Sequence, residues 1–375
     1  MILTEEQLLI QESARKFAQQ RLAPNAAQWE RQAAFPRQII EELGALGFMG
    51  MTVPPEWGGA GADYVSYALA LEEIAAGDGA IATIVSGHNS VGVMPILSFG
   101  SEAQKARYVP DLASGRKLSA FCLTEPQSGS DAAAIKTRAT RKGESYVLNG
   151  SKQFITSGAT ADIALVFAVL DPAAGKRGMG AFIVDTKAPG YRVTRIEKKM
   201  GQNASDTCAI SLDDVVVPAE DRLGEEGEGY RIALANLEGG RIGIASQCVG
   251  LARAALAIAV AYAHERCSFG KPIFEHQAVA FRLADMATNL EAAHQLTLHA
   301  AALKSAGRPS LTAASMAKLF ASEAAETICS DALQTLGGAG YMEDFGVERI
   351  YRAVRGAKIY EGTNDIQRLL VSRSL

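Results

Sequence analysis

The spacing of apolar residues changes twice along this chain, and these changes limit the folds that it can adopt. Apolar residues recur at helical spacing over about the first 120 residues, then in short runs bounded by Gly, Pro and Asp, and then again at helical spacing. A helix buries one stripe with a period of 3.6 residues, whereas a strand buries one face with a period of two. At 375 residues the chain also exceeds the usual size of a single core. We therefore predict a mainly α fold with a β domain in the middle, divided at 1–120, 121–225 and 226–375.

The first region carries signals of helix starts and ends. Thr4 and Gln7 have the spacing of a capping box, and Ala14 and Phe17 follow on one helical face until Pro24. Further helical patterns, separated by turn-rich segments, cover residues 36–48, 63–77, 80–99 and 101–114. The region is therefore predicted to be all-helical.

The middle region has the composition of strands and turns. Residues 146–148 and 152–156 are predicted strands on either side of Asn149-Gly150, a pair that is typical of tight hairpins. Later apolar segments predict further strands at 163–170, 181–184, 191–196 and 207–212. Together they indicate a small sheet or barrel that ends near residue 225.

The last region returns to long Ala-rich helical segments. Leu251 and Ala255 recur on one face of the first segment, and Leu283 and Met286 on one face of the next. Small side chains permit close helix packing, so these segments indicate a helical bundle. Several faces are more apolar than one bundle would bury, and we therefore expect contacts between subunits.

Charge and cysteine content narrow the classes of partner. The net charge of −4 and the lack of a run of Lys or Arg argue against nucleic acid. The five cysteines lie far apart and form no C-x-x-C pair, which favours a reducing compartment. The first residues are acidic where a transit peptide would be rich in Arg, and no apolar run is expected to approach the length of a bilayer. The predicted location is cytoplasmic, without a membrane partner.

Metal and serine-hydrolase chemistry lack their usual sequence patterns. The five histidines show neither H-x-x-x-H nor H-E-x-x-H spacing and have no acidic cluster beside them. We therefore predict no metal. The G-x-S-x-G turn that presents a nucleophilic serine in hydrolases is also missing.

Residues 359–367 offer a candidate general base. Glu361 stands between an apolar segment and Gly362, which would let a ligand approach the backbone. A desolvated Glu can remove a proton next to a thioester carbonyl if that carbonyl receives hydrogen bonds. The alternative interpretation is a helix start, in which Thr363 or Asn364 is the cap and Glu361 is a solvated surface acid. Local spacing leaves both interpretations open.

Two further segments could hold a polar ligand, and each also has an ordinary interpretation. Residues 123–131 are rich in hydroxyls and turn formers that suit a flavin edge or a pyrophosphate, but they also fit a loop leading into the sheet. Residues 334–341 carry closely spaced glycines that let backbone amides approach phosphates, although a helix C-terminal turn would look the same. Because helical sequence precedes those glycines, a Rossmann site is disfavoured.

Seven segments occur in the order and at the separations found in one known family. They are residues 54–61, 122–131, 149–156, 238–243, 265–277, 334–341 and 359–367. The chain resembles the acyl-CoA dehydrogenases over its whole length. This resemblance implies an N-terminal helical domain, a small β-barrel or sheet domain and a C-terminal four-helix bundle, usually assembled as a homotetramer. That order agrees with the helix, strand, helix pattern of the sequence.

The resemblance also implies FAD as cofactor and a set of residues around it. The flavin ring and ribityl chain would contact Leu123, Thr124, Ser130, Phe154, Ile155 and Thr156. The rest of FAD would contact Arg266, Phe269 and Gln277, with Gln334, Thr335, Leu336, Gly337 and Gly338 of a neighbouring subunit, and Thr363, Asn364 and Asp365. The acyl-CoA substrate would contact Ser130, Glu238, Arg241, Glu361 and Gly362.

By the same resemblance Glu361 is the base that removes the α-proton. Its backbone N–H would bind the thioester carbonyl, the product would be a trans-2-enoyl-CoA, and electrons would pass to an electron-transferring flavoprotein. Some relatives carry the base immediately before the arginine of the segment at 238–241, where this chain has Gly240. The lack of a carboxylate there supports Glu361.

Three residues depart from the common pattern of the family. Phe154 stands where relatives often have Trp, Ala353 where many have Asp, and Glu238 where short-chain relatives often have Asp. The resemblance leans toward short or branched acyl groups, as in fatty acid or amino acid catabolism. It does not determine the chain length or the pathway.

Other activities on the same scaffold are the nearest alternatives. An acyl-CoA oxidase or a flavin monooxygenase shares the fold, and fold alone does not separate them. The extra C-terminal domain of typical oxidases is not seen in the sequence, and Glu361 is retained, so a dehydrogenase is favoured. A non-catalytic flavin- and DNA-binding relative would need a basic face, which the net charge disfavours.

Overall fold

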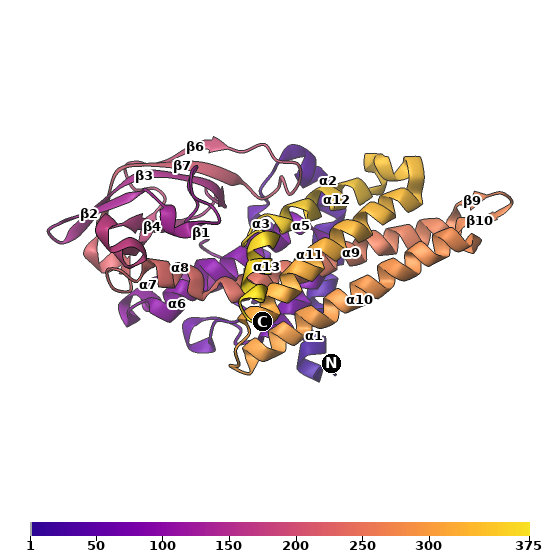
Figure 1. The fold of residues 1–375 in the computed structure, drawn as a ribbon, viewed down its shortest axis with the longest axis horizontal. Coiled ribbons are helices and arrows are strands. Elements are labelled where there is room, and N and C mark those ends of the chain that lie inside the picture. Colours follow the sequence, from indigo (N-terminus) through magenta and orange to yellow (C-terminus); the bar gives the residue numbers. More distant parts are fainter. Residues whose placement is uncertain (1) are drawn as a thin grey trace.

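A computed structural model describes residues 2–375 and shows long helices joined to a sheet at one end (Figure 1). The α-helices are α1 (Glu5–Phe17), α2 (Ala23–Gln32), α3 (Arg37–Ala45), α4 (Tyr64–Gly77), α5 (Gly79–Gly87), α6 (Met94–Phe99), α7 (Glu102–Ala113), α8 (Gly229–Ala235), α9 (Leu237–Glu265), α10 (Gln277–Ser305), α11 (Leu311–Leu336), α12 (Val347–Arg355) and α13 (Asn364–Ser372). The strands are β1 (Ser119–Cys122), β2 (Arg138–Lys142), β3 (Ser145–Thr156), β4 (Ile163–Val169), β5 (Met179–Asp185), β6 (Tyr191–Ile196), β7 (Thr207–Pro218), β8 (Arg222–Leu223), β9 (Cys267–Ser268) and β10 (Lys271–Pro272). The predicted order of helices, strands and helices is confirmed.

The N-terminal helices follow their sequence signals with one exception. The Thr4 hydroxyl accepts a hydrogen bond from the Gln7 amide, and the Gln7 side chain accepts one from the Thr4 amide, which confirms the capping box. The predicted end of the helix at Pro24 is wrong. A π-helical turn, η1 (Ala18–Leu22), follows α1, and Pro24 then stands in the first turn of α2. Proline has no N–H to donate, and the helix accommodates it where the π-helical turn η1 passes into α2.

The sheet has the strand order β6-β7-β3-β2-β4-β5-β8, with β1 parallel to β4. The central strand β4 is buried on both faces, so its sequence is a continuous apolar run. Ala164 and Val166 face one hydrophobic cluster, while Leu165 and Phe167 face another. The first of these clusters also includes residues of the N-terminal helices and of the long C-terminal helices. The three regions therefore share a continuous core.

The predicted hairpin at Asn149-Gly150 is wrong, because β3 runs through both residues. The register of β3 against β7 shifts between Leu148 and Gly150. A Cβ at Gly150 would lie 2.5 Å from the Thr137 hydroxyl oxygen. The Asn149 side chain donates to the Asp214 carboxylate at 2.9 Å, across to β7. The pair therefore marks a β-bulge with a close backbone approach, which is the other common use of Gly within a strand.

Helices α9, α10 and α11 form a bundle, with α12 and α13 packed on α11 and α4 packed on α9. The expectation that no apolar run approaches the length of a membrane span is wrong. In the described chain, Gly79–Phe99 and Gly229–Glu265 meet that criterion of length and hydropathy. Most of each apolar window is buried, 78% and 61% respectively. These segments are therefore accounted for as core helices that pack against other helices of the same chain.

Candidate active site

Glu361 lies in the short turn between α12 and α13. Its backbone φ is +54°, and that of Gly362 is +85°, so two successive residues adopt the left-handed region. This conformation costs a non-glycine residue on the order of 1–2 kcal/mol and is found where surrounding contacts enforce it. The Thr363 hydroxyl then accepts a hydrogen bond from the Ile366 amide and caps α13. Thr363 is thus the helix cap that local spacing indicated.

The carboxylate of Glu361 lies against α9, with one of its two oxygens buried. One carboxylate oxygen, Oε2, is inaccessible to solvent and has no hydrogen-bond partner within residues 2–375. A Cβ at Gly240 would lie 2.7 Å from this oxygen, so the carboxylate fills the space that a side chain at 240 would need. Burial raises the pKa of Glu361, and the charges of Arg241 and Lys318 partly oppose this. The interpretation of Glu361 as a solvated surface acid is therefore wrong.

Glycines along one side of α9 allow other elements to approach this carboxylate. A Cβ at Gly243 would lie 2.7 Å from the Tyr67 hydroxyl on α4 and 2.2 Å from the Ser86 hydroxyl on α5. The Tyr67 hydroxyl in turn lies 3.4 Å from the Ser86 carbonyl oxygen. Helices α4 and α5 therefore pack closely on α9 one turn after Gly240, which lies against Glu361.

Two charged residues near the start of α9 differ in their pairing. Arg241 is only 5% exposed, and its Nε has no partner in the described part of the chain. Its burial lowers its pKa, while Glu361 and Glu238 act in the opposite direction. Glu238 accepts hydrogen bonds from Ser310 at 2.8 Å and from Lys304 at 3.5 Å. Arg241 thus carries an unused donor beside the base, whereas Glu238 is tied to α10 and the start of α11.

The loop at 123–131 is held onto β3 by a buried ion pair that the sequence did not identify. Lys152 Nζ donates to the Glu125 carboxylate at 2.8 Å, and both side chains are almost completely buried. Glu125 also accepts from the amides of Lys136 and Thr137, and the positive charge of Lys152 helps to hold its pKa at about 2 despite burial. The one sequence feature that could have indicated this ion pair is a Lys inside an otherwise strand-like segment.

Beside this loop β3 presents Phe154 to the surface. Phe154 is 61% exposed, has a φ of +58° and lies in a second irregularity of the β3–β7 register. The backbone N–H of Gln153, the residue before Phe154, donates to the Thr124 carbonyl at 2.9 Å. This bond joins the loop to the strand. Leu123, Thr124 and Thr156 are partly buried, Ser130 is exposed and Ile155 is buried. The structure therefore brings the two predicted flavin segments together.

The remaining residues assigned to FAD by resemblance lie elsewhere. Hairpin β9–β10, which carries Phe269 at its tip, projects from the end of the bundle farthest from the sheet (Figure 1). Phe269 is 97% exposed, and Arg266 and Gln277 are also exposed. Gln334, Gly337 and Gly338 are exposed at the end of α11, whereas Thr335 and Leu336 are buried. One chain therefore does not gather all of these residues around a single ligand.

The residues after Glu361 are mostly engaged within the chain. Asn364 is buried and bonds to Lys318 and Ser322 on α11, while the side chain of Asp365 is 92% exposed. The residue that precedes the base, Tyr360, donates its hydroxyl to Gln247 at 2.9 Å. Contacts on both sides thus fix the turn that carries Glu361.

Ala353 stands where many relatives have Asp, beside an arginine that is fully paired. Arg352 donates to Glu348 at 2.7 Å and to Glu30 at 2.7 Å. The Ala353 carbonyl accepts from the Gln202 side chain at 2.7 Å. Arg352, the residue next to Ala353, is therefore paired with Glu30 and Glu348.

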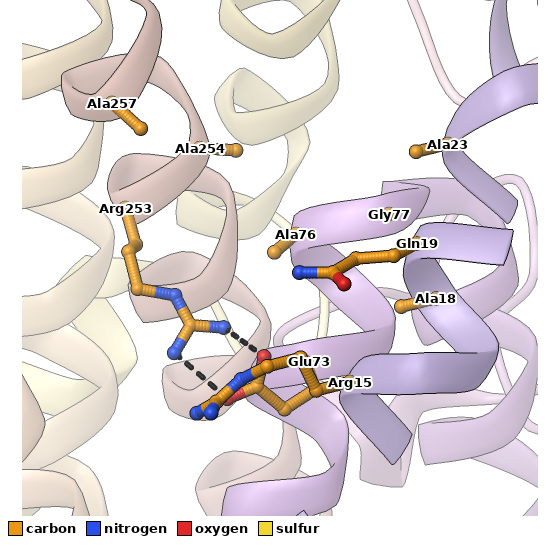
Figure 2. A pocket seen from close by; sticks show the side chains of 10 residues that line it. All are labelled: Arg15, Ala18, Gln19, Ala23, Glu73, Ala76, Gly77, Arg253, Ala254 and Ala257. Carbon is orange, nitrogen blue, oxygen red and sulfur yellow. Dashed lines mark hydrogen bonds and ion pairs between the residues drawn. The ribbon is translucent and has the colours of Figure 1, made fainter. Parts of the chain in front are cut away.

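A separate hollow of about 430 Å³ lies between α1, α4 and α9 (Figure 2). Small residues such as Ala76 and Ala254 line it, and its charged groups pair with each other. Arg253 donates to Glu73 at 2.6 Å, and Arg15 donates to Glu73 at 3.0 Å. The hollow contains none of the predicted site residues and offers no unpaired reactive group from its lining. It is therefore not the candidate active site.

Sequence comparison assigns all three regions of the chain to one family. Models of the acyl-CoA dehydrogenase N-terminal, middle and C-terminal domains match residues 4–116, 120–215 and 227–375. The chain belongs to the acyl-CoA dehydrogenase family. It is 50% identical to an acyl-CoA dehydrogenase of Bacillus subtilis over 375 residues, covering 100% of this chain and 99% of that one. It is accordingly an oxidoreductase of the acyl-CoA dehydrogenase type.

Solved structures show the same fold at full length. Butyryl-CoA dehydrogenase from Megasphaera elsdenii is 42% identical with a TM-score of 0.98, and the match covers 100% of this chain and 99% of that one. A chain from a structure of the electron transferring flavoprotein of Acidaminococcus fermentans is 45% identical with a TM-score of 0.98, covering 100% and 98%. The acyl-CoA dehydrogenase fold predicted from the sequence is thereby confirmed.

Proposed function

We propose that this acyl-CoA dehydrogenase family member oxidises short-chain acyl-CoA thioesters to trans-2-enoyl-CoA, with Glu361 as the base and FAD as the cofactor. The observation that carries the assignment of the base is the buried, unpaired carboxylate oxygen of Glu361 lying against Gly240. A buried acid with a raised pKa is matched to proton abstraction near neutral pH. Members of this family are FAD-dependent, and the named relatives support a short acyl chain.

The residues present fit a flavin. Phe154 offers an exposed aromatic surface in an irregular part of β3, beside the hydroxyl-rich loop that Gln153 joins to it. Aromatic side chains exposed on the protein surface often mark a ligand-binding site. Phe269, almost fully exposed at the tip of the β9–β10 hairpin, has the same character. FAD, when bound, accepts the β-hydride of the substrate.

The chain's own groups handle the α-proton and the thioester carbonyl. The Glu361 carboxylate receives the α-proton, and its burial keeps it basic enough to do so. The Glu361 backbone N–H makes no hydrogen bond within the described residues, so it is free to bind the thioester carbonyl and stabilise developing enolate charge. Gly362 makes room for the Gln367 side-chain amide beside this turn, and Ser130, Glu238 and Arg241 would contact the rest of the CoA ester.

The far part of the cofactor would be held by two chains. Arg266, Phe269 and Gln277 would contact it from one chain, and residues 334–338 of another would contact it from the opposite side, with residues 363–365 completing the site. The separation of these groups within one chain supports a homo-oligomer, and the resemblance specifies a homotetramer. In this proposal the three domains are 1–120, 121–225 and 226–375.

Electrons would leave to an electron-transferring flavoprotein, which the similarity to a chain in such a structure supports. The five free cysteines, four of them buried, support a reducing compartment such as the cytoplasm.

The proposal is tested with wild type and Glu361→Gln, both purified with FAD and mixed without oxygen with acyl-CoAs of four to sixteen carbons. Wild type is expected to bleach the flavin, fastest with the short chains, and Glu361→Gln to bleach it about 10²–10⁴-fold more slowly. Glu343→Gln, an exposed acid on η9 (Glu343–Phe345), is the matched control and should behave as wild type. A flavin-bound wild type that no acyl-CoA bleaches would contradict the function; rapid reoxidation by air would favour an oxidase instead.

A further inference from the structure

The turn that carries Glu361 is anchored by a single buried lysine on α11. Lys318 is 0% exposed, and its Nζ donates to the Gly362 carbonyl at 2.9 Å and to the Asn364 side-chain oxygen at 2.9 Å. One ammonium group therefore joins the residue after the base and the first residue of α13 to the same helix. No role for this lysine follows from the motifs in the sequence.

A buried ammonium group is costly unless its charge is compensated. Of the ion pairs within 4 Å in the described chain, none includes Lys318. Its compensation comes from carbonyl oxygens and from more distant charge, including that of Glu361, and burial lowers its pKa to about 8. Because a buried charge by itself adds little net stability, the contacts of Lys318 indicate what it does in the fold.

The strain in the turn indicates what Lys318 does. Glu361 and Gly362 both have positive φ, and this conformation turns the Gly362 carbonyl toward Lys318. The side-chain amide of Gln367, which is also fully buried, donates to the same carbonyl at 2.9 Å and to that of Glu361 at 3.2 Å. The two carbonyls of the strained turn are thus held by two buried donors. Strained backbone persists only where neighbouring contacts enforce it.

We propose that Lys318 is a positioning residue for proton abstraction, which holds the turn so that the Glu361 carboxylate stays against Gly240 and acts electrostatically on that carboxylate. This inference rests on the proposed function of Glu361. Lys318 does not touch the reacting atoms; its effect passes through the backbone at 361–364 and through its charge.

Several charged groups share this environment and must be considered in a pH experiment. Glu361 is acted on by Arg241 of α9 and by Lys318, and its own charge acts on Tyr67 of α4. Lys318 is acted on by Cys248 and Arg241 of α9, by Glu323 of α11 and by Glu361. Since the positive charge of Lys318 lowers the pKa of Glu361, removing that charge raises the pKa of the base. The acid limb of the rate profile then moves to higher pH.

The test compares Lys318→Met with Lys318→Arg and with the control Lys358→Met. Lys358, at the end of η10 (Gly356–Lys358), pairs with Glu326 of α11 at 2.6 Å, and in the described chain its ammonium group makes no hydrogen bond to residues 361–364. With FAD retained, Lys318→Met is expected to lower kcat for butyryl-CoA about 10- to 100-fold, to change KM less, and to move the acid limb upward. Lys318→Arg should recover part of kcat and return the limb toward wild type. Amide hydrogen exchange should increase within residues 359–367 in Lys318→Met alone.

The outcomes separate this inference from the proposed function. An unchanged kcat and acid limb in Lys318→Met would overturn the positioning role, as would a loss of kcat with an unmoved limb and no change in exchange at 359–367. If Lys318→Met does not fold, Lys318→Gln replaces it. This variant keeps a neutral hydrogen-bond donor but lacks the charge, so the acid limb of its rate profile should also move to higher pH. If Glu361→Gln bleaches the flavin as fast as wild type, the proposed function itself fails, whatever the lysine variants do.

Discussion

The two ends of the α10–α11 pair differ in how well contacts within one chain cover them. One end, called the enclosed end below, is buried and hydrogen-bonded, and the other, called the open end, exposes large apolar side chains. Near the start of α11 the base turn is enclosed, with Lys318 and Gln367 both fully buried and bonded to its carbonyls. At the other end, hairpin β9–β10 and the end of α11 expose Phe269 at 97% and Tyr341 at 84% (Figure 1). Proton abstraction thus depends on contacts inside one chain, whereas the proposed far part of the cofactor site needs a second chain to cover it.

Among the predictions for the enclosed end, the largest effect is expected from Gly240→Ala, which should displace the Glu361 carboxylate. A methyl group there would lie 2.7 Å from Glu361 Oε2, so the carboxylate must move. A displacement of about 1 Å at a reacting group costs on the order of 10²-fold in rate, and we expect kcat for butyryl-CoA to fall by about that factor with FAD retained. Stopped-flow bleaching of the flavin measures it. Gly87→Ala on α5, where a Cβ meets nothing within 4 Å, is the control; equal rates for both variants would contradict the packing described.

The open end is tested by Phe269→Ala. Because this ring makes little contact within its own chain, the free energy of unfolding of the single chain should change by less than about 0.5 kcal/mol. The dissociation constant for FAD should nevertheless rise about tenfold, as expected when an aromatic contact of a shared site is lost. Flavin fluorescence measures the affinity, and Val216→Ala, an exposed apolar residue on the sheet, is the control. Unchanged FAD affinity would mean that the hairpin does not contribute to the cofactor site.

The smallest expected effect is on stability and again concerns the enclosed end. Burial raises the pKa of Glu361, so its contribution to stability is present below the pKa of the unfolded chain and is lost as pH rises through the raised value. Between pH 5 and pH 8, Glu361→Gln should therefore gain stability relative to wild type. Urea unfolding at both pH values measures the difference. A difference that does not change with pH would show that the carboxylate is better solvated than its burial indicates.

The parts of the fold that the sequence predicted are those set by local periodicity. Helices α4 and α7 and strand β6 lie where apolar spacing indicated them. Only α7 buries a single stripe, whereas α4 is buried almost all round and β6 buries only Tyr191. The errors at Pro24 and at Asn149-Gly150 arose where one local signal has two structural uses. Proline also begins helices, and glycine also permits bulges. In both cases the decision depended on neighbouring elements, η1 in the first and Thr137 in the second.

The candidate site divides in the same way. Sequence alone identified Glu361 as a candidate base and, through resemblance, identified the family, because both depend on residue types in a fixed order along the chain. Only the tertiary structure decided that Glu361 lies buried against Gly240, that Glu125 pairs with Lys152, and that Lys318 anchors the turn at 361–364. These contacts join residues between 27 and 121 positions apart, as the numbering shows. Burial and electrostatic coupling depend on distance in space, which the order of residues alone does not supply.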